Sequence, residues 1–262
     1  AISFAFPMVF LLISIGIGVA ITGSVMVAQT IGANQERAAE RVASQTLATI
    51  LIVSTIFGVL GYFTVGDLLS LLGATGNTLT EATKYMKWIS LGLPFMFIFT
   101  AFMSLMRGYG DTITPMLVML LTVIINIVLD PFLIFGWTPF FVEMGIEGAA
   151  IATIFSRAVA TTVGVTLLFF TDRGITTHLT DLVPDRKYLR NLLFIGGPAS
   201  FEMAARAISV NLLLLVVSQF STPVIAAYGI GTRVFSIVFM PAVAVANGVE
   251  TMTGQNIGAN RP

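Results

Sequence analysis

Apolar residues fall into seven long runs along this chain, separated by short polar stretches. Each run is long enough to cross a bilayer as a helix, which takes about 20 residues. Stretches such as VFLLISIGIGVA (9–20) do not alternate apolar and polar positions, as the strands of a membrane barrel would. The pattern predicts an all-α membrane protein with seven transmembrane helices at 2–31, 42–65, 86–106, 114–136, 146–170, 191–219 and 224–254.

Composition supports the bilayer as a partner and excludes several function classes. Of the 262 residues, 56% are hydrophobic and 10% are charged, and the mean hydropathy is +0.94, whereas a soluble domain carries about 25% charged residues. The net charge is zero and no basic patch is interleaved with aromatic residues, so we expect no nucleic-acid partner. Cysteine is absent, which excludes disulfides and thiol catalysis.

Positive charge is distributed unevenly between the two sides of the predicted membrane. Only Lys84 and Lys87 lie on one side, because Arg157, Arg206 and Arg233 fall within apolar runs. The other side carries Arg37, Arg41, Arg107, Arg173, Arg186, Lys187, Arg190 and Arg261. Since cytoplasmic loops accumulate Lys and Arg, we predict a multi-pass protein of the cell membrane whose 36–41, 107–113 and 171–190 loops are cytoplasmic. Gly108 and Gly110 are expected to reverse the chain in the second of these loops.

A motif near the start of the chain recurs near its end. The stretch VAQTIGANQ (27–35) matches TGQNIGANR (253–261) with an offset of 226 residues. That offset places six helices in one repeat unit, so the two copies share one orientation. By the same offset, we expect a further helix before Ala1 and about 150 further residues after Pro262, giving a twelve-helix parent.

Ionisable residues inside the apolar runs are candidate functional residues, because a buried charge costs about 2.5 to 3.5 kcal/mol on insertion. Asp130 follows Asn126 by four residues, so both side chains share one helix face. Pro131 cannot donate a backbone hydrogen bond, which frees the carbonyl of Ile127. A carboxylate, an amide oxygen and a free carbonyl suit Na+, and equally a carboxyl that exchanges a proton. No other metal site is expected.

Five stretches together resemble the multidrug and toxic compound extrusion (MATE) transporters. They are QTIGAN (29–34) with its repeat QNIGAN (255–260), RGYGDTITPM (107–116), NIVLDPFLIFG (126–136), GIEGAAIATIFS (145–156) and AAYGIGTRVFSIVFMPAVAVANG (226–248). The resemblance implies two six-helix bundles related by a pseudo-two-fold axis, around a cavity that opens alternately to each side. On this basis, residues 1–188 form an N-terminal bundle that lacks its first helix, and 189–262 begin the C-terminal bundle.

The resemblance also implies a function and assigns residues to it. It implies an antiporter that exports organic, mostly cationic amphipathic compounds in exchange for H+ or Na+, as a monomer without a cofactor. Asp130, Asn126 and Thr153 match the ion-coupling residues of archaeal-type members. Glu202 matches a carboxylate of the second bundle that contributes to coupling or substrate binding, although Arg206 could neutralise it from one turn away.

Soft methionines and flat phenylalanines suit promiscuous binding of aromatic cations. The candidates for the cavity lining are Met96, Phe97, Phe99, Met103, Met203, Phe239 and Met240.

Two other functions are compatible with parts of the sequence. A flippase for lipid-linked precursors or polysaccharides would need a more basic cavity, which Arg157 and Arg206 allow. A polytopic membrane enzyme is disfavoured, because the sequence has neither an HExxH pair nor a nucleophile elbow. We therefore expect a transporter and not an enzyme.

Overall fold

A computed structural model describes residues 2–71, 75–137, 143–171, 174–217, 219–220 and 222–261, with side chains except at 2–12, 211, 214–215, 222–223 and 225–226. Within these ranges, the prediction of an all-α protein with seven long helices is confirmed. The helices are α1 (Ile2–Gly32), α2 (Glu36–Leu71), α3 (Gly76–Tyr109), α4 (Ile113–Phe135), α5 (Gly145–Phe170), α7 (Gly197–Val217) and α8 (Thr222–Gly258). All of them except α7 are long and apolar enough, over the described residues, to cross a membrane.

Several helices extend beyond the predicted limits. α2 begins six residues before the expected start at 42, and α3 begins ten residues before the expected start at 86. The additional turns carry charged residues, which hydropathy assigns to loops although both helices extend through them. The segment predicted to begin at 191 starts earlier, with α6 (Arg186–Asn191), and passes through a π-helical turn, η2 (Leu192–Gly196), into α7.

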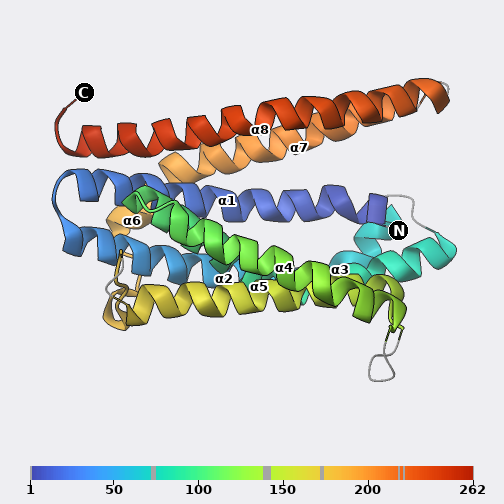
Figure 1. The fold of residues 1–262 in the computed structure, drawn as a ribbon, viewed down its shortest axis with the longest axis horizontal. Helices are drawn as coiled ribbons and strands as arrows, with labels where there is room; N and C mark the ends of the chain where they lie inside the picture. The colour runs from blue at the N-terminus through green and yellow to red at the C-terminus, as the bar shows by residue number, and fades with distance from the viewer. Residues whose placement is uncertain are drawn as a thin grey trace.

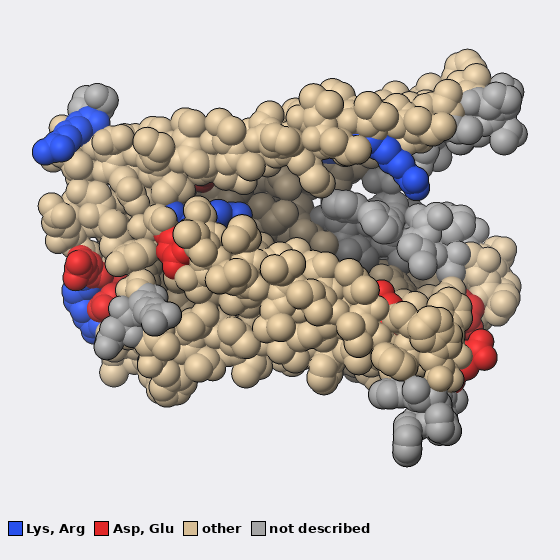
Figure 2. All heavy atoms as spheres, in the orientation of Figure 1, with Lys and Arg blue, Asp and Glu red and all other residues tan. Residues whose placement is uncertain are grey.

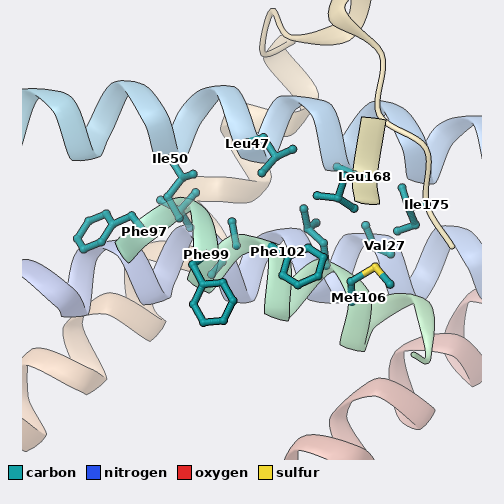
Figure 3. Close-up of a cluster of buried hydrophobic side chains, with 14 of the residues drawn as sticks. Val27, Leu47, Ile50, Phe97, Phe99, Phe102, Met106, Leu168 and Ile175 are labelled. Atoms are coloured by element: carbon teal, nitrogen blue, oxygen red, sulfur yellow. The ribbon is translucent and has the colours of Figure 1, made fainter. Parts of the chain in front are cut away.

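The helix α3 lies at the centre of the larger group of helices and packs against α1, α2 and α5, while α4 packs on α5 (Figure 1). Its side chains Phe97, Phe99, Phe102 and Met106 are buried in one apolar cluster, which residues of α1, α2 and α5 complete (Figure 3). Since lipid is as apolar as these side chains, close packing rather than water exclusion holds such helices together. This core fixes the positions of α3 and α5, which carry Arg107, Thr153 and Arg157 of the sites described below.

On the other side of α1 lie α7 and α8, which contact α1 far more than they contact each other (Figure 1). The helix α1 thus forms the wall between the two groups. The proposed domain boundary between residues 188 and 189 stays a prediction, and helical turns run across it from Arg186 to Val217.

The turn at 107–113 differs in one respect from expectation. Gly108 does not reverse the chain: it lies within α3, where a β-carbon would crowd the backbone oxygen of Ser24 on α1 at 2.5 Å. Gly110 alone adopts the left-handed conformation (φ +110°) that ends α3. The next helix, α4, begins at Ile113, whose amide donates to the Asp111 carboxylate at 2.9 Å.

Candidate ion site and inter-bundle cavity

The side chains of Asn126 and Asp130 meet on one face of α4. The Asn126 amide nitrogen donates to an Asp130 carboxylate oxygen at 3.3 Å, and both side chains are half-buried. Pro131 lies inside α4, so the carbonyl of Ile127 lacks the amide donor that would normally satisfy it. The pair therefore offers a carboxylate, an amide oxygen and a free carbonyl within one helical turn.

Thr153 lies on the neighbouring helix α5, close to the same depth. A β-carbon on Gly148 of α5 would overlap the carbonyl oxygen of Leu133 on α4, so these two residues are level. Counting along the antiparallel helices at 1.5 Å per residue, Thr153 lies about 3 Å from the level of Asp130. The Thr153 hydroxyl donates to the Ala149 carbonyl at 2.9 Å, and no hydrogen bond joins it to Asp130 or Asn126 within the described chain.

Sequence reasoning missed Tyr85 near this site. Tyr85 is half-buried on α3 and lies close enough to Asp130 for the carboxylate charge to act on its phenol. The sequence gives no signal for this proximity, because Tyr85 lies outside the predicted helix at 86–106. Only the packing of α3 against the other helices brings the two groups together.

A cavity of about 580 Å³, here called the inter-bundle cavity, is lined by residues of α1, α3, α7 and α8. Charged atoms are visible in the hollow beneath α8 on a face that is otherwise mostly uncharged between its ends (Figure 2). The lining of the inter-bundle cavity includes two basic and two acidic side chains together with Met203 and Phe239. Met240, the remaining candidate of α8, is 71% exposed and is not among the lining residues of this cavity.

Two of the four charged residues of the inter-bundle cavity form an ion pair. Arg206 donates to Glu202 at 2.8 Å one turn away on α7, so the neutralising pair expected from the sequence is present. Arg107 on α3 donates to the Ser104 hydroxyl at 2.9 Å and is close enough to Glu250 on α8 to feel its charge. Arg107 and Glu250 thus line the inter-bundle cavity from different groups of helices.

A smaller cavity, here called the Arg157 cavity, lies within the N-terminal group and has a volume of about 200 Å³. Met96, Phe97 and Met103 line it, as does Arg157. Phe99 is fully buried instead, with the Arg157 guanidinium 5.3 Å from the centre of its ring. Ile17 and Thr100 line both cavities, so the two spaces adjoin.

The repeated motif has the same local structure in both copies. Asn34 and Asn260 adopt the left-handed conformation, with φ of 56° and 54°. The following residues, Gln35 and Arg261, each donate a backbone hydrogen bond of 2.9 Å to the carbonyl five positions earlier. This is the Schellman arrangement that ends a helix, with asparagine in the left-handed position.

The two copies also pack against each other where α1 and α8 end. A β-carbon on Gly32 would overlap the backbone oxygen of Gln255, and one on Gly258 would overlap the backbone oxygen of Gln29. The Gln255 amide additionally donates to the carbonyls of Gly108 and Tyr109 at 3.3 and 3.2 Å. The contact, here called the glycine contact, is reciprocal, because a glycine of each helix packs against a backbone oxygen of the other.

Comparison with known proteins agrees with this architecture. The family model MatE matches residues 1–132 and 198–262. The chain is 33% identical to "Probable multidrug resistance protein YoeA" of Bacillus subtilis, over 99% of this chain and 57% of the relative. It is 31% identical to "FAD transporter" of Shewanella oneidensis, over 100% of this chain and 58% of that protein.

Solved structures of transporters share the fold. The chain superposes on a MOP superfamily transporter from Pyrococcus furiosus with a TM-score of 0.90 and 26% identity, covering 99% of this chain and 57% of that one. An outward-facing multidrug resistance MATE family transporter gives a TM-score of 0.89 at 25% identity, over 99% of this chain and 57% of that one. The chain thus spans a little over half the length of its relatives, and it belongs to the MatE family, the multidrug and toxic compound extrusion (MATE) transporters.

Proposed function

We propose that this protein is a monomeric secondary antiporter that exports organic, mostly cationic amphipathic compounds in exchange for H+ or Na+. The observation that carries the proposal is the Asn126–Asp130 pair within a membrane-spanning helix of a MatE protein. A carboxylate at this depth is costly unless an ion or a proton balances it. Asp130, Asn126 and the Ile127 carbonyl supply the oxygens for the ion, and Thr153 on α5 lies near enough in depth to add a fourth.

Coupling requires that the ion stabilise one arrangement of the bundles over the other. In the closed arrangement at the basic end, the glycine contact holds α8 against α1, and the Gln255 amide of α8 donates to backbone carbonyls at the end of α3. We assign this end to the cytoplasm, because most of the loop Lys and Arg residues lie there. Occupation of the Asp130 site in the N-terminal bundle then biases whether this contact stays closed, and the inter-bundle cavity carries the exported compound.

The names of the relatives support export of organic molecules, since they include multidrug resistance and multidrug export proteins. Arg157 and Arg206, which line the two cavities, favour a second candidate, a flippase for anionic lipid-linked precursors. Liposomes offered either an anionic lipid carrier or an organic cation separate the two candidates. We expect transport of the cation.

The first test measures export of a fluorescent organic cation from vesicles that contain the full-length protein, under an H+ or a Na+ gradient. Asp130→Asn keeps the shape of the side chain but removes the charge that an ion would balance. We expect ion-driven export to fall by roughly 5- to 150-fold, the usual range of a coupling free energy.

The matched control is Asp67→Asn, which changes an exposed carboxylate of α2 and is expected to leave export intact. Undiminished ion-driven export by Asp130→Asn would rule out the coupling mechanism. Export that responds to neither gradient would reject antiport altogether.

A further inference from the structure

The guanidinium of Arg157 is half-buried in the N-terminal group of helices, and no carboxylate of the described residues forms an ion pair with it. Its contacts are the Met119 sulfur at 3.5 Å and the Phe99 ring at 5.3 Å. Neither group carries a negative charge. Among the described residues, no ion pair includes Arg157.

Three carboxylates of the surrounding helices contact other residues. Asp130 accepts from Asn126, and Glu202 pairs with Arg206. Glu147 pairs with Lys84 at 3.3 Å. A cation held between a sulfur and a ring in a low-dielectric site still favours an anion strongly, because those contacts replace only part of its hydration.

The cavity in front of Arg157 limits what this anion can be. At about 200 Å³, it is smaller than the 300 to 1,000 Å³ of a typical drug site. Apart from Arg157 and Thr100, its lining is apolar, and the Thr100 hydroxyl already donates to the Met96 carbonyl at 2.8 Å. The space suits a single ring that carries a compact acidic group. It adjoins the inter-bundle cavity at Ile17 and Thr100, which line both cavities.

We propose that the Arg157 cavity binds the acidic group of a soluble aromatic anion, with the Arg157 guanidinium as the fork that holds a carboxylate. The planar guanidinium can donate two parallel hydrogen bonds to a carboxylate, which a lysine ammonium cannot match. The inference rests on the proposed function and extends its substrate class from cations to compounds that also carry an acidic group. The remainder of such a compound would lie in the inter-bundle cavity.

The test is equilibrium binding, by calorimetry, to the full-length protein in phosphatidylcholine nanodiscs without an ion gradient. Benzoate and benzylammonium serve as probes of similar shape and opposite charge. We expect benzoate to bind more tightly than benzylammonium. Because hydrogen bonds to a charged group are lost, we expect Arg157→Gln to weaken benzoate binding about tenfold or more. The benzoate affinity of Arg157→Lys should fall between those of the wild type and Arg157→Gln.

The matched control is Arg233→Gln, which removes an exposed arginine of α8 that lines neither cavity. Wild-type affinity for benzoate in this variant supports the proposal. Equal benzoate affinity in the wild type and in Arg157→Gln overturns it, and so does a preference for benzylammonium. Failure of the wild type to bind benzoate, as when an internal carboxylate already neutralises Arg157, also overturns it.

Two further measurements separate this proposal from its alternatives. Addition of phosphatidylglycerol to the nanodiscs tests a lipid headgroup as the occupant: unchanged benzoate affinity supports the soluble anion, and strong competition overturns it in favour of the lipid. Export driven by an ion gradient is measured independently. Its failure alongside Arg157-dependent benzoate binding would reject the antiporter and leave the anion site standing.

Discussion

Single residues at the candidate ion site are placed largely by local geometry. Asn126 and Asp130 are one turn apart, so any regular helix through this segment brings them onto one face. The 3.3 Å hydrogen bond between them follows from the sequence together with the helical state. The depth of Thr153 and the nearness of Tyr85, in contrast, depend on the packing of other helices around α4.

Asp185 at the start of α6 allows a prediction about pH. Its carboxylate accepts from the Tyr188 amide at 2.7 Å, and this bond, helped by Arg41, holds the pKa of Asp185 below its ordinary value despite partial burial. A lowered pKa in the folded state means that the stabilisation is present above the ordinary carboxyl pKa. It is lost as the pH falls through the lowered value.

Asp185→Ala is therefore expected to lower the free energy of unfolding at neutral pH by about 1 kcal/mol, the usual contribution of a helix N-cap. The difference from the wild type should shrink as the solution becomes more acidic than the lowered pKa of Asp185. Thermal unfolding in detergent across this range measures it. Asp185→Asn, which keeps an acceptor oxygen, should retain most of the neutral-pH stability. A loss of stability in Asp185→Ala that does not change with pH would contradict the role assigned to the Asp185 carboxylate.

At the scale of elements, the ends of α1 and α8 combine a local rule with a tertiary one. The Schellman turns at Asn34 and Asn260 are local, because the left-handed conformation and its hydrogen bonds involve only neighbouring residues. The reciprocal approach of Gly32 and Gly258 to the opposite backbone is tertiary. The repeated motif therefore ends both α1 and α8 and packs the two helix ends against each other.

Gly258→Val should open this contact, because the added carbons would overlap the backbone at Gln29 and overpacking costs about 1 to 3 kcal/mol. The measurement is cross-linking by a short bismaleimide between Ala33→Cys and Ala259→Cys. Both positions line one pocket between the two turns, and the chain has no native cysteine to interfere. We expect a clear fall in cross-linked product.

Gly229→Val is the control for this experiment, since no other part of the described structure approaches a β-carbon at Gly229 on α8 within 4 Å. Its cross-linking yield should equal that of the protein with native glycines. An undiminished yield in Gly258→Val would show that the contact does not hold the two helices at this end.

At the scale of the whole molecule, α1 contacts both groups of helices. The two cavities follow each other along its length, the Arg157 cavity nearer its start and the inter-bundle cavity nearer its end. The inter-bundle cavity touches α1 at Ile17 and Ile21, and the Arg157 cavity touches it at Ile13 and Gly16. A movement of α7 and α8 about the glycine contact would change the first cavity more than the second. This difference suits a fixed ion site in one bundle and a substrate space between the bundles.

The orientation in the membrane gives a prediction at the same scale. Single cysteines at Gln35 and Thr112 lie at the basic end, and one at Asn77 lies at the start of α3 at the opposite end; all three positions are exposed. A membrane-impermeant maleimide should label the first two only in inside-out vesicles, and the third only in right-side-out cells. The reverse labelling would place the basic end outside and contradict the assigned direction of transport.

The sequence by itself determined seven apolar helices, the asymmetry of charge and the paired helix ends, because bilayer thickness, loop charge and local hydrogen bonds act along the chain. Tertiary structure alone decided which faces of those helices meet. In lipid every face of a helix is apolar, so hydropathy does not reveal its packing side. That is why Gly108 against Ser24, Arg107 near Glu250 and Arg157 over Phe99 became visible only when the helices were assembled.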